Sequence, residues 1–140
     1  MVFSPTGSTN EGSVIMARQS IDVASFTHVN PIPCASRIGP LLVSSVIAAR
    51  DPGATTVPDA PEAQYVNLFH HIGQMLAAAG GDWRHVARIT FFVPDIAFRD
   101  ACNPTWVEHF PDPASRPARH TQVVAGGKIA SCEFIAYIDD

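Results

Sequence analysis

One stretch near the end of the chain, residues 128–138, constrains the fold more than any other. Its even-numbered residues from 130 onward are all small or apolar: Ala130, Cys132, Phe134, Ala136 and Ile138. Its odd-numbered residues mix apolar side chains with one carboxylate, Glu133. A period of two places these two sets on opposite faces of a β-strand. We expect the even face to pack against helices and Glu133 to lie on an open sheet face, which is a candidate oligomer interface.

Apolar runs predict the remaining strands. They lie at 21–26, 41–47, 86–93 and 119–124, and valine and isoleucine favour the extended conformation. The run 41–47 is rich in apolar residues, with valine and isoleucine among them, and follows Gly-Pro, which predicts a buried strand. Gly126-Gly127 separates the last two strands and predicts a hairpin between them.

Two helices fit between these strands. Asp59 and Glu62 form a capping-box pattern at the start of the first, and Gly80-Gly81 ends it. Asn103-Pro104 matches a helix cap followed by proline, so a second helix should run from there to Phe110. The order of elements predicts a two-layer α/β (α+β) sandwich, with a mixed sheet and two helices on one face.

The chain is short enough for one folded domain. Its 140 residues fit a domain at 21–140, preceded by a flexible N-terminal arm at 1–20 that has no sustained periodicity. Three widely spaced cysteines indicate free thiols in a reducing compartment. The first residues show neither a signal peptide nor a membrane-spanning apolar run, so we expect a cytoplasmic protein with no membrane partner.

Charge and motifs exclude several classes of function. The net charge is −4, with 9 Lys and Arg against 13 Asp and Glu, whereas nucleic-acid binders usually carry a basic excess. The six histidines show no metal-binding spacing, and the glycine pairs match no phosphate loop. We therefore expect no metal, no cofactor and no nucleic acid.

Three polar residues remain as candidates for chemistry. Arg119 stands where a proline-rich loop enters a strand, and could grip a carboxylate or be an ordinary surface arginine. Glu133 is costly to bury in an apolar strand unless it forms a salt bridge or takes part in proton transfer. Asn103 could cap a helix, contact a ligand, or both. The residues alone leave these alternatives open.

Several of these segments together resemble a known family. They are Arg37-Ile-Gly-Pro-Leu-Leu-Val-Ser-Ser, Ala78-Ala-Gly-Gly-Asp82, Val86-Ala-Arg-Ile-Thr-Phe-Phe-Val-Pro-Asp95, Arg116-Pro-Ala-Arg119 and Glu133-Phe-Ile-Ala136. With Asn103, Trp106 and Phe110 between them, the chain resembles the RidA/YjgF reactive-intermediate deaminases over residues 21–138.

The resemblance implies a chorismate-mutase-like fold and a homotrimer with clefts between subunits. It also implies hydrolysis of reactive enamines or imines to a 2-keto acid and ammonia without a cofactor. Arg119 would grip the carboxylate of a small substrate, Glu133 would position or activate water, and Asn103 would line the cleft. Such a reaction needs mainly orientation and one proton shuttle.

Two departures from the family pattern fall on expected cleft positions. Many active members have tyrosine where this chain has Ile32, and Ser-Gly where it has Ser45-Val46. An isoleucine cannot relay a proton as a tyrosine hydroxyl can. The substrate could therefore be bulkier or more apolar, or the protein could be a non-catalytic metabolite-binding trimer. A ribonuclease or translation inhibitor, a label that some relatives carry, is disfavoured by the acidic charge balance.

Overall fold

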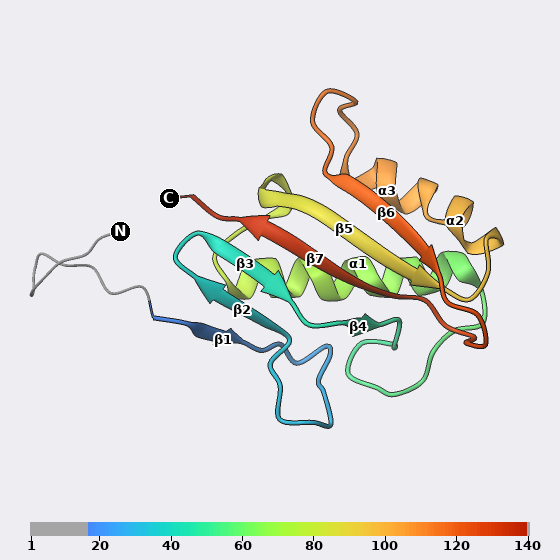
Figure 1. The fold of residues 1–140 in the computed structure, drawn as a ribbon, viewed down its shortest axis with the longest axis horizontal. Helices are drawn as coiled ribbons and strands as arrows, with labels where there is room; N and C mark the ends of the chain where they lie inside the picture. The colour runs from blue at the N-terminus through green and yellow to red at the C-terminus, as the bar shows by residue number, and fades with distance from the viewer. Residues whose placement is uncertain (1–16, 140) are drawn as a thin grey trace, which may run out of the picture.

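The computed structural model describes residues 17–139 as one mixed sheet with helices on a single face (Figure 1). The strands are β1 (Gln19–Ile21), β2 (Ala35–Ile38), β3 (Leu41–Ser44), β4 (Ile47–Ala48), β5 (Val86–Val93), β6 (Ala118–Val123) and β7 (Ser131–Tyr137). The helices are α1 (Pro61–Ala78), α2 (Ala97–Ala101) and α3 (Asn103–His109), with a short 3₁₀ turn, η1 (Trp83–His85), before β5. The predicted two-layer α/β architecture is confirmed. Most of the predicted N-terminal arm lies outside the described residues.

β7 runs through the middle of the sheet. The strand order is β1-β2-β3-β7-β5-β6, and β4 also pairs with β7. β6 pairs with β5 in parallel, while β7 is antiparallel to β5 on its other side. The predicted hairpin between the last two strands is therefore wrong. Gly126, with φ of 94°, permits the turn, but the chain then passes the end of β5 before it pairs.

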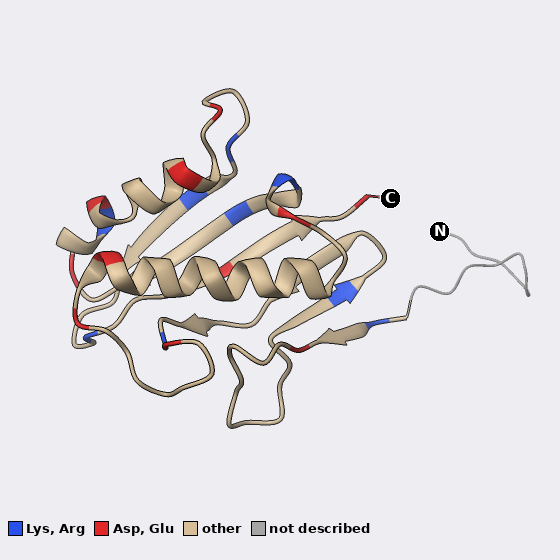
Figure 2. Ribbon diagram, turned by 180° about the vertical axis from the view of Figure 1, so that it is seen from behind, with Lys and Arg blue, Asp and Glu red and all other residues tan. Residues whose placement is uncertain are grey.

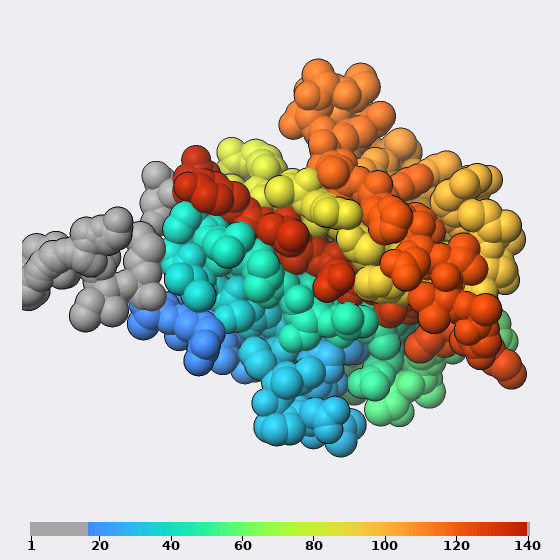
Figure 3. Space-filling model, in the orientation of Figure 1, coloured from blue at the N-terminus to red at the C-terminus, as the bar shows by residue number. Residues whose placement is uncertain are grey.

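The alternation predicted for β7 is confirmed. All five even-numbered residues from Ala130 to Ile138 are buried, and the odd-numbered residues are half-buried or exposed. Figure 2 shows the helices lying across one face of the sheet. Figure 3 shows the other face, where β3, β7, β5 and β6 reach the surface with no helix over them. Glu133 lies on this open face.

Helix α1 buries the stripe that its spacing predicts: Tyr65, Leu68, Phe69, Ile72, Met75 and Leu76. Gly80, with φ of 83°, follows its C-terminus as predicted. The predicted capping box is wrong, because the N-cap residue is Ala60 and no side chain caps the helix. Pro61 occupies the first turn, so Asp59 lies one residue too early to reach the free amides.

The predicted strand 41–47 is interrupted. It divides into β3 and β4, because residues 44–46 lie opposite only residues 133 and 134 of β7. This bulge is stabilised by side chains: the Ser44 hydroxyl accepts a hydrogen bond from the Phe134 amide at 2.9 Å. Val43 and Val46 are exposed, so the expectation of a wholly buried strand was also wrong.

The N-terminal part of the sheet differs from the expectation as well. The first strand ends at Ile21, where 21–26 was predicted, and β2 was not predicted. Phe26 is nevertheless buried, although it lies in a loop. None of the helices in residues 17–139 is long and apolar enough to cross a membrane.

Candidate functional site

Arg119 is held at the edge of the sheet on the helix side. Its Nη2 donates a hydrogen bond to Asn103 Oδ1 at 3.0 Å. The guanidinium carbon lies 5.0 Å from the centre of the Trp106 ring, which gives a cation–π contact. Nη1 is buried and has no hydrogen-bond partner within residues 17–139, and no carboxylate there forms an ion pair with Arg119. The side chain is thus oriented while its charge stays free for an anion.

The Asn103 side chain binds Arg119 and does not cap helix α3. It is the first residue of α3, the N-cap position belongs to Cys102, and no side chain makes a capping bond. Because α2 runs almost directly into α3, Cys102 is already helical, with φ of −70° and ψ of −29°. The cap reading of Asn103 is therefore wrong, and its amide oxygen is free to orient Arg119.

The side chains packed behind Arg119 are buried and unreactive. Tyr65 is buried, and its hydroxyl donates to the Phe98 carbonyl at 2.8 Å. Burial raises the pKa of the Cys102 thiol to about 11, although the nearby Arg119 charge lowers it in part. Cys102 is therefore a neutral thiol at physiological pH. It neither acts as a thiolate nucleophile nor neutralises Arg119.

Glu133 lies on the opposite face of the sheet from Arg119. Thr90 of β5 pairs with both Glu133 and His120, whereas Ile89 pairs with Arg119 and Phe134. Successive residues of a strand point to opposite faces, so these two rows lie on different sides. One chain alone therefore does not bring Arg119 and Glu133 to the same ligand. A second copy would have to supply one of them.

The Glu133 face carries a polar groove of about 500 Å³. Thr90 lies at its centre, with Glu133 on β7 and His120 on β6 as direct cross-strand neighbours. Its other lining residues are Val43, Ser44, Arg88, Phe92, Gln122, Phe134 and Ile135. The Arg88 side chain forms no ion pair with another described residue. These cross-strand neighbours follow only from the register of β5 with β6 and β7.

The other predicted cleft residues gather where β3 gives way to β4. The Ser45 hydroxyl donates to the Pro33 carbonyl at 2.7 Å, so its proton is committed within the chain. Ile32 is 48% exposed on the neighbouring loop. Val46 is 47% exposed and lines an apolar cavity of about 340 Å³ with Phe92, Val93, Val124, Gly127, Ile129 and Ser131.

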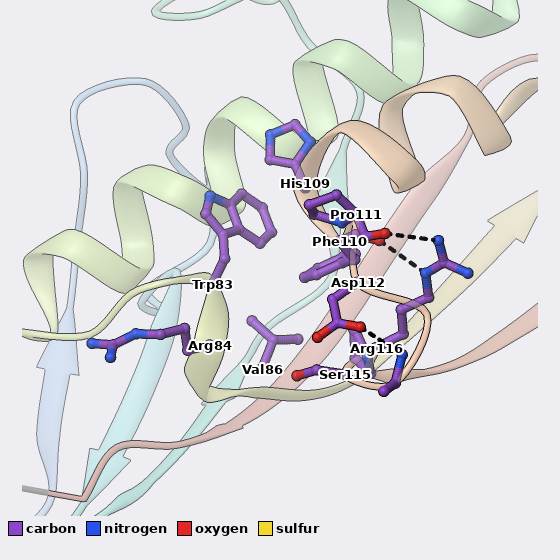
Figure 4. A pocket seen from close by; sticks show the side chains of 11 residues that line it. Trp83, Arg84, Val86, His109, Phe110, Pro111, Asp112, Ser115 and Arg116 are labelled. Atoms are coloured by element: carbon purple, nitrogen blue, oxygen red, sulfur yellow. Dashed lines mark hydrogen bonds between the residues drawn. The ribbon is translucent and has the colours of Figure 1, made fainter.

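A further cavity, of about 330 Å³, lies between η1 and the 110–117 loop (Figure 4). Trp83 and His109 form one side, and Asp112 and Arg116 lie on the other. Its charged groups are already engaged: Arg116 donates to the Phe110 carbonyl at 2.8 Å, and Asp112 accepts from the Ala114 amide at 2.9 Å. With its charges engaged in this way, the cavity is a weaker candidate than the surroundings of Arg119 and Glu133.

No group of three or more His, Cys, Asp or Glu side chains within the described part of the chain is placed to hold a metal ion. The expectation that the protein uses no metal or cofactor stays an expectation.

The fold and the Arg119–Asn103 pair place the chain among small proteins built from one mixed sheet, with a site at the sheet edge. The sequence profile described as Endoribonuclease L-PSP matches residues 24–129. The chain therefore belongs to this family, which is the RidA/YjgF family. No curated protein matches the chain.

Solved structures agree with the fold. RidA from the Antarctic bacterium Psychrobacter sp. PAMC 21119 is 25% identical with a TM-score of 0.77, and the match covers 86% of this chain and 99% of that one. The YjgF gene product from E. coli is 22% identical with a TM-score of 0.76, covering 85% and 98%. A probable translation initiation inhibitor from Rhodopseudomonas palustris is 22% identical with a TM-score of 0.80, covering 89% and 100%.

Proposed function

We propose that the protein hydrolyses reactive enamine or imine forms of 2-amino acids, and that it needs no cofactor. The observation that carries this proposal is the state of Arg119, which is oriented by Asn103 and Trp106 yet unpaired with any described carboxylate. An arginine fork held in this way suits a substrate carboxylate, which it can bind through two parallel hydrogen bonds. Family membership supports the same activity.

The reaction needs one water and one proton shuttle. An enamine first becomes its imine tautomer, whose carbon is electrophilic. Glu133 takes a proton from water as the oxygen bonds to that carbon, and then passes this proton to the imine nitrogen. In the resulting carbinolamine the hydroxyl proton moves to the nitrogen, again by way of Glu133, as the C–N bond breaks and the C=O bond forms. Imine and water thus become a 2-keto acid and ammonia. Holding the carboxylate at Arg119 fixes the imine carbon for attack, which is where most of the acceleration would arise.

We propose that the working protein is a homotrimer located in the cytoplasm. Arg119 and Glu133 lie on opposite faces of one chain, so the cleft would combine Arg119 of one subunit with Glu133 of the next. The open face also exposes large apolar side chains that a second copy could cover: Ile38, Leu41, Val43, Ile135 and Tyr137. All three cysteines are free and buried, which suits a reducing compartment.

The test uses imino acids generated in situ by an amino acid oxidase, with keto-acid release followed against the spontaneous rate. We expect Arg119→Ala and Glu133→Gln each to lower kcat/KM by about a hundredfold or more, since a proton shuttle alone contributes roughly 10²–10⁴. Arg99→Ala and Glu108→Gln change exposed residues on α2 and α3 and serve as matched controls. Unaltered turnover in either site variant would remove that residue from the mechanism.

One observation favours a second candidate, a metabolite-binding trimer without turnover. Ile32 offers no hydroxyl, and the Ser45 proton is committed to Pro33, so fewer groups near the bulge can move protons. This alternative predicts binding of 2-keto acids by calorimetry, dependent on Arg119, with imine hydrolysis at the spontaneous rate.

A further inference from the structure

We propose that the apolar cavity beside Glu133 receives the hydrocarbon side chain of the substrate. The preferred substrate would then be the imine of a branched or aromatic amino acid, and not that of a small or acidic one. The inference rests on the proposed function, because it places the reacting carbon near Glu133. It adds to that function a side-chain site made by Val46, Phe92, Val124 and Ile129.

The register places this cavity next to Glu133. Ile47 pairs with Cys132, and Ala48 pairs with Ser131. The same register continued by one residue puts Val46 opposite Glu133, on the open face. Phe92, whose cross-strand neighbour on β7 is Ser131, lines both this cavity and the Glu133 groove. Phe92 therefore borders both hollows, which lie next to each other on the open face.

The bulge at residues 44–46 creates this arrangement. The β3–β4 segment has one more residue than the part of β7 that it faces, and such bulges redirect side chains beside functional sites. Side-chain hydrogen bonds replace the backbone bonds that the bulge disrupts. The Ser44 hydroxyl accepts from the Phe134 amide, and the Ser45 hydroxyl donates to the Pro33 carbonyl. Val46 is then free to face the cavity, with 47% of its surface exposed.

The lining of the cavity defines what it can hold. Apart from Gly127 and the hydroxyl of Ser131, its side chains are hydrocarbon, and none is charged. An acidic side chain there would lose water without gaining a partner, which is costly. The volume of about 340 Å³ lies at the lower end of the range for small-molecule sites. An apolar pocket discriminates by roughly tenfold or more per methylene, so a leucine side chain should be favoured clearly over a methyl group.

The first experiment compares kcat/KM for imines freshly made from alanine, leucine, phenylalanine and aspartate, using the unaltered full-length protein. We expect the leucine- or phenylalanine-derived imine to exceed the alanine-derived imine by at least about tenfold, and the aspartate-derived imine to be the poorest. Turnover of the alanine-derived imine without this preference would overturn the side-chain site and leave the proposed function standing.

The second experiment locates the preference. Val124→Ser should lower kcat/KM for the leucine-derived imine by about tenfold more than it lowers kcat/KM for the alanine-derived imine. Val66→Ser changes a similarly exposed valine on the outer side of α1, at 56% against 50% for Val124, and should alter neither. Sedimentation of both variants checks that assembly is intact. Equal losses on both substrates would place the preference elsewhere.

A binding measurement tests the cavity even if no imine is hydrolysed, which would defeat the proposed function. Calorimetry would compare 4-methyl-2-oxopentanoate with pyruvate on the unaltered protein and on Val124→Ser. A Kd at least about tenfold lower for the branched acid, lost in Val124→Ser, supports the site. Equal affinity for the two acids, or binding of neither, overturns it.

Discussion

Gln64 connects helix α1 to the start of the strand that carries Glu133. It is buried, its Oε1 accepts the Ala130 amide at 2.7 Å, and its Nε2 donates to the Pro58 carbonyl at 2.9 Å. We predict that Gln64→Met, which preserves length and removes both polar ends, will destabilise the fold. The Ala130 N–H would remain buried without a partner, and the partly buried Pro58 carbonyl would lose one bond.

The magnitude follows from these two groups. An unsatisfied buried amide costs about 1–3 kcal/mol, and a lost ordinary hydrogen bond costs about 1 kcal/mol. Better burial of the methionine offsets part of this, which leaves a net loss of about 2 kcal/mol. For a domain of this size each kcal/mol corresponds to about 4 °C in Tm, so the expected fall is on the order of 8 °C.

Denaturant and thermal unfolding would be measured at one protein concentration, because assembly would stabilise the folded state. Gln74→Met is the matched control, since Gln74 is exposed on the same helix and makes no side-chain hydrogen bond to a described residue. It should change the free energy of unfolding by less than about 0.5 kcal/mol. Equal stability of the two variants would refute the claim that Gln64 satisfies the amide of Ala130.

Two other changes test stability. Ala60→Ser should raise the free energy of unfolding by about 1 kcal/mol, because Ala60 caps α1 with φ of −70° and ψ of 129° but offers no side-chain acceptor; unchanged thermal stability would contradict this. Burial lowers the pKa of His71, whose Nδ1 contacts the Ser25 hydroxyl and whose Nε2 contacts the Arg50 carbonyl. As the pH falls through about 6.5, His71 therefore gains a proton in the unfolded chain but stays neutral in the folded protein. Stability should be level above that pH and fall below it, and His71→Gln should lessen the fall; the same pH profile in both proteins would exclude His71 as its source.

Local patterns predicted the layers of the fold but not the pairing of its strands. The alternation of β7 identified its buried and open faces, because side-chain direction depends only on the strand itself. The hairpin prediction failed because a pair of glycines indicates where the chain turns, but it does not indicate which strand the chain pairs with after the turn. The bulge at Ser44–Val46 was likewise invisible, since it depends on hydrogen bonds to residues 90 positions away along the chain.

Sequence reasoning proposed the members of the candidate site but not their arrangement. Arg119, Asn103 and Glu133 were chosen from the sequence, and the structure brings the first two together at 3.0 Å. The opposite orientation of Arg119 and Glu133 required the strand register. The prediction that Asn103 caps a helix failed because the residue before it, at the end of α2, is already helical. The sequence carries no strong signal for the end of α2.

The central position of β7 also shapes how the protein folds. β3 and β5 each pair with it, yet both are made well before residues 131–137 emerge from the ribosome. Until then these strands lack their shared neighbour and present unpaired edges, which favour association with other chains. Because these paired strands are far apart in the sequence, they also raise the contact order of the fold, and a high contact order slows folding. The strand that positions Glu133 is thus the one that completes the sheet.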